Sequence, residues 1–179
     1  MITVNEKTCV GCEACVNICQ QDCIKMLQNM EGFYYPYVDT TACVNCGACN
    51  NVCIAEQERI NNKSFISCYA AISKNDNERL KSSSGGVFSV LANYVLENNG
   101  VVYGAAFSNN LTVHHIRIDN TNELGLLRGS KYVQSHIDKS FSLAENDLKD
   151  GKYVLFTGTG CQIDALKLYL GAEYENLFW

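Results

Sequence analysis

Two short runs of cysteine constrain this chain more than any other feature. Residues 9–19 read CVGCEACVNIC and residues 43–53 read CVNCGACNNVC, so the spacing Cys-x2-Cys-x2-Cys-x3-Cys occurs twice, 34 residues apart. The first three cysteines of such a run form a tight loop whose thiolates face one point, with backbone N–H groups that can hydrogen-bond inorganic sulfide. The pattern therefore predicts iron–sulfur clusters.

Two other uses of cysteine compete with this interpretation. The start MITVNEKT lacks the basic-then-apolar pattern of an export signal, so we expect a cytoplasmic protein with reduced thiols rather than a disulfide framework. Zinc also binds Cys-x2-Cys pairs, but its sites usually separate two such pairs, whereas here three ligands fall within seven residues. A zinc-stabilised interaction module remains as an alternative.

Composition and charge narrow the class of partner. A chain that is 47% hydrophobic and 18% charged has the make-up of a globular protein, and no run reaches the roughly 18 apolar residues of a membrane span. Of the net charge of -5, most lies in residues 1–60, which hold three Lys and Arg against seven Asp and Glu. This acidic half predicts docking on a basic redox partner protein or subunit, and it argues against nucleic acid.

The cysteine spacing resembles that of the bacterial two-4Fe-4S ferredoxins, over about residues 1–60. The resemblance implies an α+β ferredoxin-like domain with two short strands, Ile24 to Leu27 and Phe33 to Val38. In that family the fourth cysteine of each run ligates the other cluster. One cluster would then take Cys9, Cys12, Cys15 and Cys53, and the other Cys43, Cys46, Cys49 and Cys19.

Two further observations concern this match: the residue after each fourth cysteine, and the cysteines outside the repeat. The proline that follows each fourth cysteine in the family is replaced by Gln20 and Ile54, which changes the chain path after the ligand but removes no ligand. Cys23 and Cys68 fall outside the repeat, and we interpret both as buried small hydrophobic residues.

The second half predicts alternating strands and helices. Residues 61–80 are expected to form a linker and a first strand, FISCYAAI at 65–72. A helix then begins beside Gly85-Gly86 and ends at Gly100, with Val87, Leu91, Tyr94 and Val95 on one face. A hairpin is expected over 101–118, helices over 122–128 and 139–150, and a strand followed by a helix over 153–171. Helices that separate strands imply an α/β layer with partly parallel pairing.

Two turns in this half carry possible chemistry. SSSGG at 82–86 and TGTGCQ at 157–162 both place small residues at the start of an expected helix, where free N–H groups and the helix dipole favour an anion such as a cofactor phosphate. An ordinary capped turn has the same composition, so each turn alone leaves both interpretations open.

From about Cys68 onward, the blocks SSSGGVFSVLANYVLENNGVVYGAAF, LRGSKYVQS and VLFTGTGCQIDALKLYLG resemble the beta-subunit family of coenzyme F-420-reducing hydrogenases and dehydrogenases. The resemblance implies an iron–sulfur flavoprotein oxidoreductase subunit that holds FAD or FMN and, in archaeal members, uses F-420 as a substrate. Carried over to this chain, the residues that approach the flavin are Ser84, Gly85, Gly86, Lys131, Thr157, Gly158, Thr159 and Gln162.

The match to that family is incomplete. Gly160 stands where the family has a proline, and Cys161 after it is either a reactive thiol at a helix start or a structural residue. Residues 81–179 cover only the N-terminal part of the family's α/β domain, so we expect either a truncated chain or a second chain that supplies the remainder. The fold class is thus a ferredoxin-like domain over 1–60 followed by an incomplete α/β domain.

No residue is assigned as a catalytic acid or base. His114 and His115 are neighbours in an expected strand and point to opposite faces, and His136 is isolated in the sequence. Flavin chemistry requires no such residue, because the cofactor carries the reaction. The alternative to a flavoprotein subunit is a ferredoxin-like electron carrier with a non-catalytic second domain.

Overall fold

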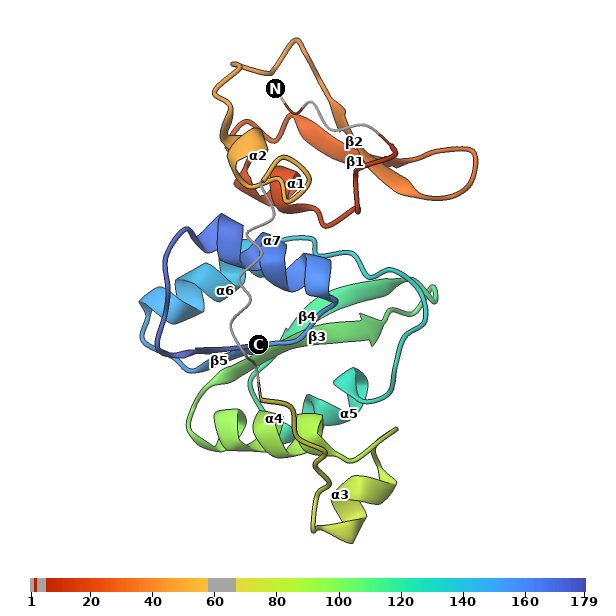
Figure 1. The fold of residues 1–179 in the computed structure, drawn as a ribbon, viewed down its shortest axis with the longest axis vertical. Coiled ribbons are helices and arrows are strands. Elements are labelled where there is room, and N and C mark those ends of the chain that lie inside the picture. The colour runs from red at the N-terminus through yellow and green to blue at the C-terminus, as the bar shows by residue number, and fades with distance from the viewer. Residues whose placement is uncertain (1, 3–5, 58–66) are drawn as a thin grey trace.

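The computed structural model describes residues 2, 6–57 and 67–179. We call residues 6–57 the cysteine-rich part and residues 67–179 the α/β part. The two lie one above the other in Figure 1, with the cysteine-rich part against helices α6 and α7. Among the described residues, no helix is long and apolar enough to cross a membrane.

The cysteine-rich part contains two short helices and one hairpin. Helix α1 (Ala14–Ile18) and helix α2 (Ala48–Asn51) each follow the second cysteine of a run. Strands β1 (Ile24–Gln28) and β2 (Tyr34–Val38) pair antiparallel, within one residue of the predicted limits. Cysteines form most of one buried cluster here, in which Cys15, Cys23, Cys49 and Cys53 pack with Ile2 and Ile24.

The α/β part is built on a four-stranded sheet in the order β4-β3-β5-β6. Strands β3 (Val101–Phe107) and β4 (Val113–Ile118) form the predicted hairpin. Strands β5 (Val154–Phe156) and β6 (Leu177–Phe178) add to it in parallel, so the expectation of partly parallel pairing is confirmed.

Helices cover both faces of this sheet (Figure 1). Helices α6 (Ser140–Lys149) and α7 (Gly160–Leu170) pack on one face, against Val101, Tyr103, Val154 and Phe156. On the other face lie helices α4 (Val87–Glu97) and α5 (Leu124–Leu127), which pack against Val102, Ala106 and Leu155. The 3-10 turn η1 (Thr121–Glu123) leads directly into α5. Alternate residues of β3 and β5 thus enter two separate cores, as the two-residue period of a strand requires.

The two parts of the chain share one of these cores. Ala14 of α1, which is 0% exposed, and Val52 belong to the same hydrophobic cluster as Phe141, Leu166 and Leu170 of α6 and α7. The position of the cysteine-rich part is therefore set by apolar packing as well as by polar contacts.

Two predictions for the start of the α/β part are wrong. No strand forms in the described portion of 65–72: residues 67–72 are exposed and irregular, residues 65 and 66 lie outside the described range, and the predicted buried thiol of Cys68 is exposed. The chain instead forms helix α3 (Asp76–Leu80), whose N-cap Asn75 accepts hydrogen bonds from the N–H groups of Asn77 and Glu78.

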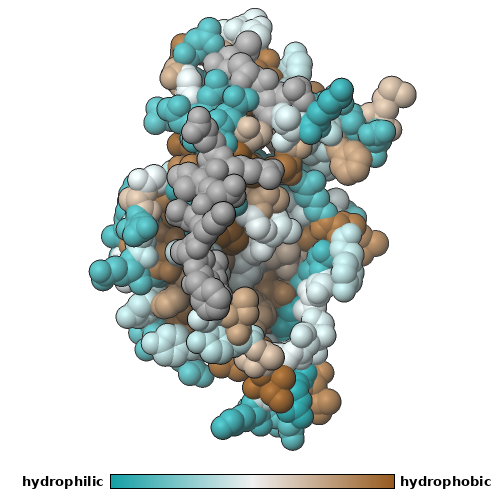
Figure 2. All heavy atoms as spheres, viewed as in Figure 1, coloured by the Kyte–Doolittle hydropathy of each residue, from teal (hydrophilic) through white to brown (hydrophobic). Residues whose placement is uncertain are grey.

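The face of α4 that meets the sheet also differs from the prediction. Ser89, Ala92, Val95 and Leu96 are buried, whereas Val87, Leu91 and Tyr94 are largely exposed. Small residues on the buried stripe let the helix lie close to the sheet. Hydrophobic side chains also reach the surface at the α3 end of the molecule, where Figure 2 shows brown spheres. Leu80, the last residue of α3, is 83% exposed.

Candidate functional site

The eight repeat cysteines fall into two groups of four around two cavities. Cys9, Cys12, Cys15 and Cys53 line a small cavity of about 20 Å³. Cys19, Cys43, Cys46 and Cys49 line a second cavity of about 250 Å³. The fourth cysteine of each run thus lies with the first three of the other run. We call these groups the first set and the second set.

Left-handed backbone residues shape both cysteine loops. Gly11 and Glu13 have φ of 63° and 60° in the first run, and Asn45 and Gly47 have φ of 57° and 80° at the matching positions of the second. Each reversal turns the chain tightly, and the first three thiols of each run line the same cavity. In the first loop the Gly11 N–H donates to the Cys9 sulfur at 3.4 Å.

Burial raises the pKa of three thiols of the first set, Cys9, Cys12 and Cys15. It raises the pKa of the Cys12 thiol to about 11, against an opposing hydrogen bond from the Ala14 N–H, and it also raises the pKa of Cys15. The neighbouring thiols of Cys53 and Cys161 act on Cys12 in the same direction. Because cysteine binds metal as a thiolate, iron binding here would release protons.

A fifth thiol, Cys23, lines the second cavity. It is buried, as predicted, and its sulfur lies 3.4 Å from that of Cys19. This hydrogen bond is the main cause of the raised pKa of Cys23.

None of the eleven cysteines forms a disulfide, and among the described residues no three Cys, His, Asp or Glu side chains converge as ligands of one ion.

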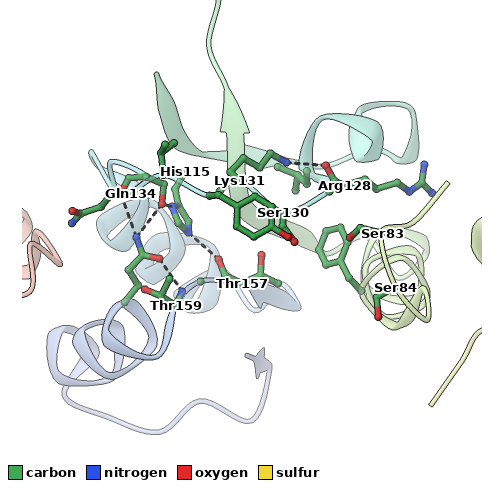
Figure 3. Close-up of a pocket in the computed structure, with 18 of the residues that line it drawn as sticks. Ser83, Ser84, His115, Arg128, Ser130, Lys131, Gln134, Thr157 and Thr159 are labelled. Carbon is green, nitrogen blue, oxygen red and sulfur yellow. Dashed lines mark hydrogen bonds between the residues drawn. The ribbon is translucent and has the colours of Figure 1, made fainter. Parts of the chain in front are cut away.

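A third cavity, of about 920 Å³, lies in the α/β part at the carboxyl ends of β3 and β5. Three segments line it: 82–88, 127–135 and 157–162. In Figure 3, Ser83 and Ser84 lie across the view from Thr159, and segment 127–135 runs between them, from Arg128 near the serines to Gln134 near Thr159. All eight residues predicted to approach a flavin are among the lining residues: Ser84, Gly85, Gly86, Lys131, Thr157, Gly158, Thr159 and Gln162. Val10 and Gly11 of the first cysteine run complete the wall.

The SSSGG segment is held rigidly at the start of α4. A Cβ atom on Gly85 would lie 2.4 Å from the carbonyl oxygen of Ala71, and the Gly85 carbonyl accepts from the Ser73 N–H at 2.6 Å. Gly86 is the N-cap of α4 in the left-handed conformation, and no side chain caps the helix. The first N–H groups of α4 are therefore left for a ligand or solvent at the cavity wall.

The TGTGCQ turn is capped by its own side chains. The Thr159 side chain accepts from the Gln162 N–H, and the Thr159 N–H donates to Gln162 Oε1 at 2.9 Å. Gly160 is the first residue of α7, which is the position where a proline also fits, so its replacement leaves the helix start intact. Of the two predicted anion sites, only the start of α4 thus lacks side-chain capping.

Two cations line the cavity. Arg128 donates to Ser89 Oγ and to the Glu78 carboxylate, so its charge is paired. The Lys131 ammonium donates to the carbonyl oxygens of Arg128 (2.9 Å) and Leu126 (3.1 Å), as Figure 3 shows for Arg128. Partial burial lowers its pKa, and within the described part of the chain no carboxylate pairs with it.

His115 is a site residue that the sequence did not predict. It is buried at the cavity base and stacks on Phe156, with ring centroids 5.3 Å apart. Its Nε2 lies 2.8 Å from the Thr157 carbonyl oxygen, which can only accept, so Nε2 carries the hydrogen. In the neutral ring, Nδ1 then accepts from Ser135 Oγ at 3.0 Å. Burial lowers the pKa of His115, which favours this neutral form.

Comparison with known families supports the assignment of the cysteine-rich part. Residues 8–56 match the family model described as a 4Fe-4S dicluster domain. The match supports an iron–sulfur domain of the ferredoxin type in this part of the chain, and such a domain suggests an electron carrier. A search of curated proteins finds no match to the chain. The resemblance of the α/β part to the F-420 beta-subunit family therefore remains a prediction.

Proposed function

We propose that the chain is an iron–sulfur oxidoreductase subunit that exchanges electrons between two 4Fe-4S clusters and a flavin. The first set of cysteines (Cys9, Cys12, Cys15 and Cys53) would hold one cluster and the second set (Cys19, Cys43, Cys46 and Cys49) the other. The observation that carries the flavin assignment is the cavity of about 920 Å³, because its wall contains all eight predicted residues together with part of the first cysteine loop.

The chemistry of the cavity wall suits an anionic dinucleotide or mononucleotide cofactor. The start of α4 has uncapped N–H groups beside Ser84 and Gly85, where the helix dipole favours a phosphate. Lys131 places a positive charge at the same cavity. When bound, clusters would supply one-electron steps and a flavin one- or two-electron steps. The residues of this chain would hold the groups, and F-420 is one candidate acceptor beyond them.

A second candidate is an electron carrier that binds no flavin. The capping box of α7 favours it, because the Thr159 and Gln162 side chains already satisfy part of the helix start that a phosphate would otherwise meet. In this case the α/β part would serve to dock a redox partner.

The deciding experiment is cofactor analysis of protein purified without oxygen. We expect near eight iron atoms per chain and visible absorbance that dithionite bleaches, which zinc would not give. Heat-denatured supernatant should contain close to one flavin per chain. Iron without flavin would overturn the flavin proposal and leave the electron carrier.

Three variants test the residues. Cys12→Ser and Cys46→Ser should each remove about half of the iron, since each takes one ligand from a different set; loss in neither would contradict the assignment. Lys131→Ala should weaken flavin binding by about tenfold, the usual scale for one charge-assisted contact. Lys149→Ala, on the exposed end of α6 beside Glu145, is the matched control.

A further inference from the structure

The two cysteine loops have the same spacing but differ at their left-handed positions. The second loop has Asn45 and Gly47 there, and both residue types adopt this conformation readily. The first loop has Gly11 and Glu13. Glutamate has no intrinsic preference for φ near 60°, so some other interaction must favour it at position 13.

That interaction comes from the α/β part. The Glu13 side chain is buried, with residue exposure of 6%, and its carboxylate accepts three hydrogen bonds across the junction. His136 Nδ1 lies 2.9 Å from Oε1, while the Ile137 and Asp138 N–H groups donate to Oε2 at 2.9 and 3.0 Å. His136, which looked isolated in the sequence, is thus in contact with the first cysteine loop.

The α/β part also accounts for the absence of a side chain at Gly11. A Cβ atom there would lie 2.4 Å from Gln134 Nε2, and Gln134 donates through the same nitrogen to the Gly11 carbonyl oxygen at 2.7 Å. An asparagine, as at position 45, would collide with Gln134. At Gly47, by contrast, a Cβ atom would meet nothing within 4 Å.

We propose that Gly11 and Glu13 are positioning residues that adapt the first cysteine loop to dock on segment 134–138 of the α/β part. They determine which set of cysteines borders the large cavity, because Val10 and Gly11 of this loop line it. The second loop lacks both adaptations, and its Cys46 is exposed. The docking itself is independent of any flavin, and only its use in electron exchange rests on the proposed function.

Hydrogen exchange in the anaerobically purified full chain tests this proposal. In Glu13→Gly, the local backbone conformation is retained or favoured, but the acceptor is lost. We expect the Ile137 and Asp138 amides to exchange at least tenfold faster, with unchanged exchange in β1 and β3. Glu13→Gln keeps one acceptor oxygen and should restore part of the protection, an effect that a merely space-filling side chain would not produce.

Two further variants complete the test. Gly11→Asn should speed exchange at the same two amides through steric displacement of Gln134, and Asn45→Gly, the matched change in the second loop, should leave them unaltered. Iron content measures whether each variant retains its clusters. Unchanged protection of Ile137 and Asp138 in both Glu13→Gly and Gly11→Asn would overturn the proposal. Because the readout needs no flavin, this failure is distinct from failure of the proposed function.

Discussion

At the scale of single residues, three side chains converge on the buried carboxylate of Asp147 in α6. Its carboxylate accepts from Tyr103 Oη at 2.6 Å, from Arg117 Nε at 2.8 Å and from Lys152 Nζ at 2.7 Å. Burial alone would raise the pKa of Asp147, but the hydrogen bonds from Arg117, Lys152 and Tyr103 hold it at about 2. The carboxylate is therefore charged at neutral pH.

We predict that Asp147→Ala lowers the free energy of unfolding by about 3 kcal/mol, because it leaves the Tyr103 hydroxyl and the Arg117 guanidinium without their buried partner. A lowered folded-state pKa means that the stabilisation is complete above the usual value near 3.8 and is lost as pH falls toward about 2. The difference from the parent chain should consequently be constant between about pH 5 and pH 8. Urea unfolding followed by circular dichroism checks this. A loss that varies across this range, or that is below about 1 kcal/mol, would contradict it.

A second prediction at this scale concerns His115. His115→Phe keeps the stacking on Phe156 but removes the bonds to Thr157 and Ser135, so the 157–159 turn loses one of its supports. We expect weaker flavin binding, by roughly three- to tenfold, with iron content unchanged. Flavin titration of apo-protein measures it, and His114→Phe, on the opposite face of β4, serves as the control. Equal effects of the two substitutions would assign no role to His115.

At the scale of elements, the chain at the start of α4 packs so closely on segment 71–73 that no side chain fits at Gly85. Gly85→Ala forces its new methyl group against the Ala71 carbonyl oxygen, so either the 71–73 segment or the SSSGG turn must move. We predict a loss of at least tenfold in flavin affinity with full iron content. Gly125→Ala in α5, where a Cβ atom meets nothing within 4 Å, should change neither quantity. Unaltered affinity in Gly85→Ala would show that this turn is not part of the flavin site.

Local patterns predicted most elements but not their burial. The hairpin of β3 and β4, the strand β5 and the limits of α7 follow from alternation, from Gly171 and from the turn at 108–110. Helix α4 carries two apolar stripes, and sequence alone could not tell that the stripe with Ala92 and Ser89 faces the sheet. The composition of 65–72 favoured a strand, yet the described residues 67–72 join neither of the two sheets.

For the candidate site, the sequence likewise predicted the local motifs but not the contacts between distant segments. The eight repeat cysteines and the three cavity segments stand out as motifs, because spacing and glycine turns are visible locally. Glu13, Gln134 and His115 act through contacts between segments far apart in sequence, so no local pattern indicated them. The available signal was the difference between the two loops at their left-handed positions, where the first has Gly11 and Glu13 and the second has Asn45 and Gly47.

At the scale of the whole molecule, the folded structure of the two parts should depend to different extents on bound iron. The separate core of the cysteine-rich part is built mainly of thiols, whereas the sheet of the α/β part packs against two apolar cores, to one of which Ala14 and Val52 contribute. We predict that removal of iron with a chelator abolishes hydrogen-exchange protection in α1 and α2 while amides of β3 and β5 stay protected. Simultaneous loss of protection in both parts would mean that the sheet is stable only with the clusters in place.

The unequal exposure of the two cysteine sets has a consequence for how the protein matures in the cell. In the first set Cys15 and Cys53 are buried and Cys12 packs against the core that α6 and α7 form, while Cys46 of the second set is open to solvent. A cluster-assembly protein would therefore have to fill the first set before the α/β part closes over it, but it could fill, or later repair, the second set on the finished molecule. A brief exposure to air should accordingly leave half-loaded protein that regains its iron without unfolding.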